Sequence, residues 1–430
     1  MATNIILLVL TVLEIFFFVW NVKDKSTHIR WKGAARLGIA IIITVLMLAG
    51  VLQGLLRYAG IVLLLTVMGI LSMISLRRKG ERETSAGNQA FRAVGSGMLY
   101  TTAMLPAILF PQYKAIVPTG SYNIETALYT WTDESRVETY ANTGEKRKVT
   151  VEFYYPDRAG RYPLVVFSHG AAAMIESNAS TCRELASHGY VVAAVAHPYH
   201  AIFVKAADGQ ITPINTEFMT MATGGMMSLN AEEKLALYQD WIKIRTGDVN
   251  FVLDTILQKA AKREEGAFAC VDTEHIGLFG HSLGGATSEA VGRQRDDIDA
   301  VIVLEGTLLG EYIGCEGDHF LYNMEPYPLP LLDVNSDSLL ENVAKDYANG
   351  DQYINFYIMQ NGVDAREVTF DNAAHMNFCD LPLVSPPLAS LFGVGKRDAR
   401  ACVETMNGMV LNYFDYYLKN SSQLEIANEY

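Results

Sequence analysis

Four long apolar runs before residue 114 constrain this chain more than any other feature of its 430 residues. They cover residues 5–22, 37–56, 58–76 and 93–113, and the last is the most polar of the four. A membrane-spanning helix needs roughly 20 predominantly apolar residues. The runs therefore predict an anchor of four transmembrane helices over residues 1–113, which would make the chain an integral membrane protein embedded in a bilayer.

Charge separates the anchor from the rest of the chain. Residues 1–113 contain 11 Lys and Arg but only 4 Asp and Glu, whereas residues 114–430 contain 23 and 43. Because so acidic a globular part would repel nucleic-acid phosphates, we expect no nucleic-acid partner. Half of all residues are hydrophobic, which excludes a disordered chain.

The basic residues of the anchor predict its orientation. Five Lys and Arg lie at positions 23–36, between the first two runs, and five more at positions 77–92, between the last two. Basic loops stay on the cytoplasmic side, so four crossings would place residues 114–430 outside the cytoplasm, at the plasma membrane. An odd number of crossings would reverse this. The first run has no basic residue ahead of it and no small-residue cleavage site after it, which favours a retained helix over a cleaved signal.

Glu14 interrupts the first run near the middle of the expected bilayer. An ionised side chain at that depth costs roughly 3 kcal/mol or more. We expect a protonated side chain that packs by hydrogen bonds against the other helices. The alternative is a contact with a transported proton or a lipid headgroup.

Beyond residue 114, strand-like apolar runs alternate with helical segments. Strands are expected at 149–155, 162–167, 190–196, 275–279, 300–304, 330–334 and 367–370, with helices at 177–188 and 231–262. Continuous apolar runs are typical of buried parallel strands. The alternation predicts an α/β fold over residues 114–430, with a mostly parallel sheet and helices on both faces.

The strand at 275–279 runs directly into Gly280-His281-Ser282-Leu283-Gly284. In such a strand-to-helix turn the serine takes a strained position with its hydroxyl exposed, and the glycines prevent clashes. We therefore predict that Ser282 is a catalytic nucleophile. A serine hydroxyl needs a base, and His375, in the loop after strand 367–370, is the one histidine beyond residue 319.

The acid that would orient His375 has two candidates. Glu305 ends the strand at 300–304, and Asp337 follows the strand at 330–334. Both positions lie at the carboxyl edge of the sheet, where such sites form. A carboxylate at either position would fix the imidazole tautomer and stabilise its charged form.

Two backbone N–H groups would hold the oxyanion that develops during such a reaction. We expect them from Leu283, which follows the nucleophile, and from Ala171, in the loop after strand 162–167. The residues expected around the substrate are His169, Gly170, His197 and His281, of which His281 packs beside the nucleophile.

Two further features have alternative interpretations. His197 and His200 have the spacing of metal ligands, but no third ligand is apparent, so we expect a pocket wall and no metal. Residues 201–230 lack periodicity and contain several Met around Gly224-Gly225. They are either a soft apolar lid over an acyl pocket or an ordinary buried loop.

Several of these motifs together resemble the plasma-type platelet-activating factor acetylhydrolases, within the α/β-hydrolase superfamily. The similar stretches are PTGSY at 118–122, WTDESR at 131–136, VFSHG at 166–170, LASHGYVVAAV at 185–195 and GHSLGGAT at 280–287. The resemblance covers roughly residues 115–420 and not the apolar N-terminus. It implies Ca²⁺-independent hydrolysis of short or oxidised acyl groups from phospholipids. The catalytic aspartate of that family falls at the position of Glu305 here, so the acid would have become a glutamate.

The sequence thus predicts a membrane-anchored serine ester hydrolase that needs no cofactor. Its expected substrates are short or modified acyl esters of phospholipid or another amphiphile, cleaved through an acyl-enzyme. Three alternatives remain: an acyltransferase with the same triad, a hydrolase of soluble esters of the dienelactone or polyester type, and a non-enzymatic membrane sensor.

Overall fold

A computed structural model describes residues 2–24, 28–78, 85–141, 143–348 and 353–430 of the chain. Contacts divide the chain into two units. The smaller comprises Met1–Lys114 with Leu383–Leu391, and the larger comprises Ala115–Pro382 with Phe392–Tyr430. The first boundary lies one residue from the predicted one, whereas Leu383–Leu391 was expected in the larger unit. Three basic residues of the orientation argument, Lys25, Lys79 and Arg82, lie outside the described residues.

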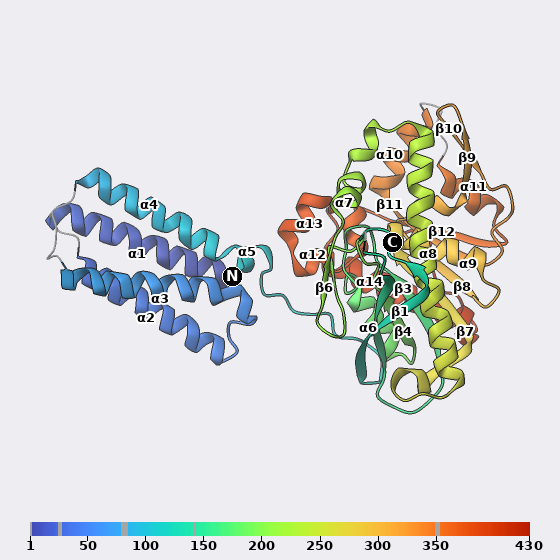
Figure 1. Cartoon of the computed structure of the whole chain (residues 1–430), viewed down its shortest axis with the longest axis horizontal. Coiled ribbons are helices and arrows are strands. Elements are labelled where there is room, and N and C mark those ends of the chain that lie inside the picture. Colours follow the sequence, from blue (N-terminus) through green and yellow to red (C-terminus); the bar gives the residue numbers. More distant parts are fainter. Residues whose placement is uncertain (1, 25–27, 79–84, 142, 349–352) are drawn as a thin grey trace. The chain divides into compact units, whose positions relative to one another are not determined.

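The N-terminal part of the smaller unit contains four long helices and a short one among the described residues (Figure 1). They are α1 (Ala2–Asp24), α2 (Ile29–Leu48), α3 (Leu55–Arg78), α4 (Ala86–Ala103) and α5 (Leu105–Leu109). Within the described residues, three helices are long and apolar enough to cross a membrane, at Ala2–Asp24, Ile29–Leu48 and Leu55–Ile74. The fourth predicted run, 93–113, is not one helix, because α4 begins earlier and α5 starts afresh with Pro106 in its first turn.

Glu14 is buried between three of these helices. Its carboxylate accepts hydrogen bonds of 2.8 Å from Arg36 of α2 and from the hydroxyl of Tyr100 on α4, and it also pairs with Lys32 of α2. Arg36 donates further to Ser96, at 3.1 Å. Glu14 therefore faces the other helices and forms hydrogen bonds there, as predicted, but two of its partners are basic side chains that the prediction did not include. The prediction missed this because it assigned Lys32 and Arg36 to a loop, whereas α2 begins at Ile29.

Three polar side chains of α4 face inward. Gln89, Ser96 and Tyr100 are buried, and Gln89 accepts a hydrogen bond of 3.2 Å from Asn21 of α1. The apolar residues Phe91, Val94 and Met98 are exposed instead, at 80%, 58% and 67%. The other polar residues of α4, Asn88, Arg92, Thr101 and Thr102, are exposed. Asn88 and Arg92 lie in the first two turns, where a side chain can reach the membrane interface, and the two Thr hydroxyls donate to carbonyls of the helix itself. A helix of this kind can lie in a bilayer when its polar groups are satisfied within the bundle.

We expect α4 to cross the membrane together with α1, α2 and α3, which places both chain termini on the same side. In sealed vesicles, epitope tags at the N-terminus and the C-terminus should be cleaved or protected together when protease is added from one side. Tags that differ in protection would mean three crossings and a larger unit on the opposite side from the N-terminus. Detergent-opened vesicles, in which both tags are cleaved, serve as the control.

The larger unit contains a sheet of eight strands in the order β1-β2-β4-β3-β7-β8-β11-β12. All neighbours are parallel except β1 with β2 and β2 with β4. The strands are β1 (Ile124–Val137), β2 (Lys146–Pro156), β3 (Tyr162–Ser168), β4 (Val191–Val195), β7 (Val271–His281), β8 (Ala300–Leu304), β11 (Pro330–Ser336) and β12 (Asp364–Phe370). The predicted parallel sheet is confirmed, and β3, β4 and β8 are buried along their whole length.

Helices cover both faces of this sheet, as predicted. One face carries α8 (Ala231–Ala261) and α9 (Leu283–Gln294), which pack together. The other carries α6 (Ala179–Ser187) and α14 (Ala399–Lys419), and Phe414 of α14 lies so close to Gly277 of β7 that a Cβ there would clash at 2.5 Å. Figure 1 shows α8 in yellow-green running along the sheet.

The remaining elements connect these layers. Two hairpins lie outside the sheet, β5 (Phe203–Lys205) with β6 (Ile211–Pro213) and β9 (Tyr312–Glu316) with β10 (His319–Tyr322). The other α-helices of the larger unit are α7 (Thr216–Ala222), α10 (Asp337–Ala348) and α11 (Ile354–Asn361). The helices α12 (Leu381–Val384) and α13 (Pro386–Phe392) fall mostly in the segment Leu383–Leu391, which belongs to the smaller unit. Short 3₁₀ turns are η1 (Gly225–Ser228), η2 (Gly266–Cys270), η3 (Leu309–Glu311) and η4 (His375–Phe378).

Candidate active site

Ser282 stands at the junction of β7 and α9 in a backbone conformation that side chains rarely adopt. Its φ is 56° and its ψ is −126°. Neighbouring glycines make this turn possible. A Cβ at Gly284 would lie 1.9 Å from the carbonyl oxygen of Ser168, and a Cβ at Gly280 would lie 2.2 Å from the Gly284 carbonyl. Residues with such strain gather at functional sites, and the strand-to-helix turn lies where the sequence predicts it.

Glu305 reaches His375 from the end of β8. Its Oε1 lies 3.2 Å from Nδ1 of His375, and its Oε2 accepts a hydrogen bond of 2.9 Å from the Ser336 N–H. The residue is 7% exposed and has a φ of 48°. Both carboxylate oxygens are therefore engaged, and the contact at Nδ1 turns the Nε2 edge of the imidazole away from Glu305.

Asp337, the other candidate acid, lies elsewhere. Its carboxylate accepts hydrogen bonds of 2.9 Å from the N–H groups of Asn372 and Ser338. It thus ties the loop that carries His375 to the start of α10. Of the two candidates, the structure brings Glu305 to the imidazole.

His281 packs beneath the same loop. Its Nε2 donates to the carbonyl oxygen of His375 at 3.1 Å, and the two rings are 4.6 Å apart between centroids. Burial, with a smaller contribution from His375, holds the pKa of His281 well below its usual value. The ring is therefore neutral at pH 7, and it supports the backbone of the His375 loop.

Ser282, Glu305 and His375 line one cavity of about 270 Å³. The two predicted oxyanion donors, Leu283 and Ala171, line it as well. The other lining residues are largely apolar or aromatic: Ala222, Met226, Tyr238, Trp241, Thr307, Leu309, Leu339 and Tyr353. The cavity therefore combines a few polar side chains with an apolar wall, as binding sites for small molecules do.

His197 does not line this cavity, contrary to the prediction. Its ring nitrogens lie 2.9 Å from Ser168 Oγ and 3.0 Å from Asp248 Oδ2. All three residues are at most 1% exposed. This second Ser-His-Asp arrangement is closed to substrate, and Ser168 sits in regular strand instead of a strained turn. The sequence locates His197 at a strand end but cannot show that α8 covers it.

His169 is buried with it. Its Nδ1 donates to the Gly170 carbonyl at 2.7 Å, and its Nε2 accepts from the His197 N–H at 3.1 Å. The ring therefore supports the loop and does not face the cavity. Gly170 lies against the turn, because a Cβ there would be 3.3 Å from Cβ of Ser282.

The ring nitrogens of His200 are also engaged by protein groups. Nδ1 accepts from Nε of Arg245 at 3.2 Å, and Nε2 lies 2.7 Å from the Tyr140 hydroxyl. Within the described ranges, no group of three or more His, Cys, Asp or Glu could hold a metal ion. The HPYH segment is therefore part of a buried hydrogen-bond network.

Residues 201–230 contribute part of the cavity wall. Ala222 of α7 and Met226 of η1 line the cavity, and Phe218 packs on Trp241 with ring centroids 4.8 Å apart. Met227, next along η1, is 90% exposed. The segment thus combines a buried inner side with an apolar side chain in solvent, and whether it opens as a lid stays a prediction.

Sequence reasoning missed the contribution of α8. Tyr238 and Trp241 line the cavity. Arg245 is fully buried beneath the loop after β3, and Asp248 is fully buried against His197, which follows β4. The sequence does contain these four residues at the spacing of one helix face. Their common face could be recognised only once the partner of that face was known.

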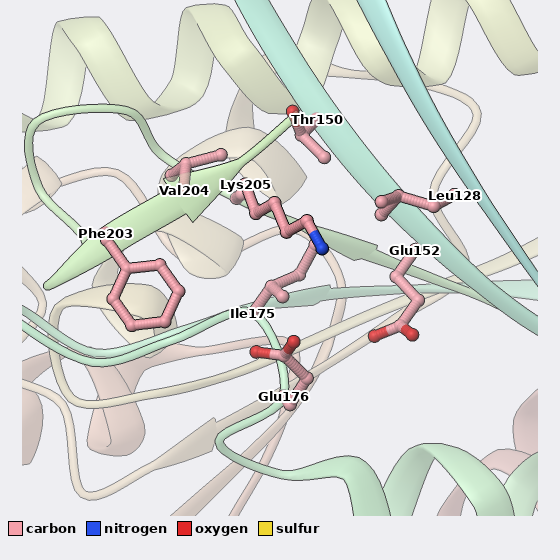
Figure 2. Close-up of a pocket in the computed structure, with 9 residues that line it drawn as sticks. Leu128, Thr150, Glu152, Ile175, Glu176, Phe203, Val204 and Lys205 are labelled. Atoms are coloured by element: carbon pink, nitrogen blue, oxygen red, sulfur yellow. The ribbon is translucent and has the colours of Figure 1, made fainter. Parts of the chain in front are cut away.

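A second cavity, of about 90 Å³, lies in another part of the larger unit (Figure 2). Glu152, Glu176 and Lys205 face it among apolar side chains, as Figure 2 shows. None of the predicted site residues is among the described residues that line it.

With this geometry in view, the chain can be compared with known proteins. The family model described as platelet-activating factor acetylhydrolase, isoform II, matches residues 136–429. The chain belongs to this family. The family match includes Ser282, Glu305, His375 and the loop after β3, so the site described above lies within the acetylhydrolase-like region.

Individual relatives agree with this assignment. The platelet-activating factor acetylhydrolase of Gallus gallus is 24% identical over 278 residues, which are 60% of this chain and 62% of that protein. That of Cavia porcellus is 26% identical over 295 residues, 63% of this chain and 61% of that protein. The chain thus matches about six-tenths of the length of these relatives.

A solved structure shows the same fold. The ferulic acid esterase from Streptomyces cinnamoneus aligns with a TM-score of 0.55 at 21% identity, over 72% of this chain and 95% of that one. The larger unit therefore has the α/β-hydrolase fold, as the sequence predicts.

The buried His197 leads to a prediction for acid stability. Burial, reinforced by Arg245, lowers its pKa to about 4 from about 6.5. Between these values the unfolded chain binds a proton that the folded chain does not, so this residue makes stability fall as pH falls. Its contribution at pH 5 should be about 2 kcal/mol lower than at pH 7.5.

Urea unfolding in detergent, at pH 7.5 and pH 5, would measure this in the wild type and in His197→Asn. The stability difference between the two proteins should shrink by that amount at pH 5. The exposed His319, changed to Gln, provides the matched control and should leave the pH dependence unaltered. A difference of equal size at both pH values would contradict the prediction.

Proposed function

We propose that this chain is a membrane-anchored serine ester hydrolase that cleaves short or modified acyl esters of amphiphilic substrates. The observation that carries the proposal is the shared cavity. It combines Ser282 in a strained strand-to-helix turn with His375, whose Nδ1 lies 3.2 Å from Glu305. A binding module would not need this combination.

The geometry supports a two-step acyl transfer. The Ser282 hydroxyl attacks the ester carbonyl while Nε2 of His375 takes its proton, and Glu305 keeps Nδ1 of the ring protonated and oriented. The oxyanion receives hydrogen bonds from the N–H groups of Leu283 and Ala171. His375 then returns the proton to the leaving alcohol, and water, activated by the same imidazole, releases the acid from the acyl-enzyme.

The cavity favours a short acyl group. Its volume of about 270 Å³ lies just below the range of typical ligand pockets, which is roughly 300–1,000 Å³. No Lys or Arg is among the described residues that line it, so it suits an acyl chain better than a phosphate. Trp241 and Tyr238 bound the apolar side. We infer that the alcohol part of the substrate, with any charged headgroup, stays outside.

The apolar helices of the smaller unit support an anchor in the plasma membrane, with the catalytic unit on the extracytoplasmic side if four helices cross. Anchoring would keep the cavity close to esters that partition into a bilayer. We also infer phospholipid as the preferred substrate class, which follows the name of the family.

The experiment that tests this function is a chain-length series. p-Nitrophenyl esters from acetyl to dodecanoyl, and phospholipids with short sn-2 acyl groups, would be offered to the detergent-solubilised full chain. We expect rapid turnover of acetyl to hexanoyl esters and a loss of at least about 10³-fold in Ser282→Ala.

Each alternative outcome has a distinct meaning. Activity that survives Ser282→Ala would overturn the site. Serine-dependent activity on soluble esters without any on phospholipid would leave the mechanism and remove the lipid substrate. New esters formed when alcohols are added would indicate an acyltransferase.

The two candidate acids can be separated by isosteric variants. Glu305→Gln should lower kcat by about 10³–10⁴-fold, because an amide cannot hold the imidazole in the required tautomer and charge state. Asp337→Asn should lower kcat by less than about 10-fold, since its carboxylate accepts only backbone N–H groups. Thermal unfolding of both variants should stay near that of the wild type. A larger loss in Asp337→Asn than in Glu305→Gln would reverse the assignment.

A further inference from the structure

One face of α8 carries four residues that reach the site. Tyr238, Trp241, Arg245 and Asp248 follow one another at spacings of 3, 4 and 3 residues, which places them on one side of a helix. The first two line the cavity. The last two are 0% exposed and meet the loop and strand ends behind it.

Arg245 is bonded to groups of that loop. Its Nη1 donates to the carbonyl oxygen of His169 at 2.6 Å, and its Nη2 donates to that of Gly170 at 3.3 Å. Its Nε donates to Nδ1 of His200 at 3.2 Å. All three acceptors are neutral. Burial lowers the pKa of Arg245 to about 9, so the guanidinium stays charged at pH 7.

We propose that Arg245 is the positioning residue of the oxyanion site, which fixes the Gly170–Ala171 peptide so that the Ala171 N–H points into the cavity. The proposal rests on the proposed function. A trans peptide is planar, and its C=O and N–H point in opposite directions. No cis bond occurs in the described chain. Because Arg245 holds the Gly170 carbonyl from behind, the N–H of the same peptide faces the other side, where Ala171 lines the cavity.

This peptide needs such a constraint. Gly170 has the backbone freedom to let it turn over, and Ala172 is already strained, with a φ of 51°. If the Gly170–Ala171 peptide plane rotated by about half a turn, the Ala171 N–H would be buried and the Gly170 carbonyl would point at the oxyanion. Arg245 opposes this rotation of the peptide, because the rotation would leave the buried guanidinium without one of its hydrogen-bond acceptors.

Two neighbouring contacts brace the same loop. The Ala172 N–H donates to the His200 carbonyl at 2.9 Å, and the ring of His200 receives Arg245. Asp248, one turn along α8 from Arg245, holds His197 against Ser168. Asp248 is itself paired with Arg147 and Arg136, at 2.6 and 2.9 Å. Nδ1 of His169 also donates to the Gly170 carbonyl, at 2.7 Å. Arg245 contacts both this carbonyl and that of His169, so it fixes two successive peptides of the loop and is the charged group of the network that does so.

The test uses the full chain in detergent and compares Arg245→Met and Arg245→Lys with the wild type. The readouts are kcat and KM on p-nitrophenyl acetate and the inhibition constant of phenylboronic acid, which forms a tetrahedral adduct on a catalytic serine. We expect Arg245→Met to lower kcat roughly 10²-fold with KM changed less than 3-fold. Boronate affinity should fall by a similar factor, and Arg245→Lys should recover part of both losses.

Arg293→Met is the matched control. Arg293 also donates to two loop carbonyls, those of Pro326 and Glu325, but it belongs to the far end of α9 and does not line the cavity. Its loss should lower thermal stability while kcat, KM and boronate affinity stay within about 3-fold of the wild type.

A double-mutant cycle completes the test. Ala171→Pro removes the N–H that Arg245 is proposed to aim, so Arg245→Met should add little to the loss that Ala171→Pro causes alone. Independent, multiplying losses would overturn the proposal. So would a folded Arg245→Met with wild-type kcat and boronate affinity, or failure of both Arg245 variants to fold, which would mark a purely structural residue.

Failure of the proposed function and failure of the Arg245 proposal would give different results. It fails if the wild type shows no hydrolysis that depends on Ser282, and the proposal for Arg245 falls with it. If Ser282-dependent hydrolysis is present and Arg245→Met leaves it unchanged, the positioning role alone is overturned.

Discussion

The close approach of α9 to the end of β3 is the constraint on which the site depends. Gly284 packs so tightly over the Ser168 carbonyl that no side chain fits between them. This contact lets the chain turn at Ser282 with a positive φ and brings the first N–H groups of α9 beside the loop after β3. The proposed nucleophile and the proposed oxyanion donors therefore come from separate elements but depend on one packing contact. A larger residue at Gly284 would separate all of them at once.

Much of the larger unit could be predicted from sequence because its strands are buried on both faces. Continuous apolar runs located β3, β4 and β8 to within a residue or two, and β8 matches its predicted bounds. By contrast, β1 alternates between half-buried and exposed residues and contains many polar ones, so no apolar run marks it. Chain order and the Gly-x-Ser-x-Gly turn were enough to single out Ser282 and His375. The choice between Glu305 and Asp337 needed the loop geometry, because both follow strands at the same sheet edge.

Burial was the property that the sequence did not supply. His169 and His197 follow strand ends just as site residues do, yet α8 covers them and they form hydrogen bonds inside the protein. In the smaller unit, the sequence likewise did not show which charged side chains are buried between helices. Lys32 and Arg36 look like loop charges, but they are helical and meet Glu14. Gln89, Ser96 and Tyr100 of α4 face the same interior, so composition alone does not show which polar residues of that helix an apolar surrounding would contact.

The stripe along α8 has a consequence for how such a protein can change. Tyr238 and Trp241 line the cavity, Arg245 holds the loop after β3, and Asp248 holds His197, all from one helix. Inserting or deleting a single residue in α8 before Tyr238 would rotate the whole stripe by about 100° and remove both contributions together. Substitutions at Tyr238 or Trp241 can therefore change the shape of the cavity while the loop stays supported. An insertion or deletion in this helix would disturb the cavity wall and the loop support at the same time.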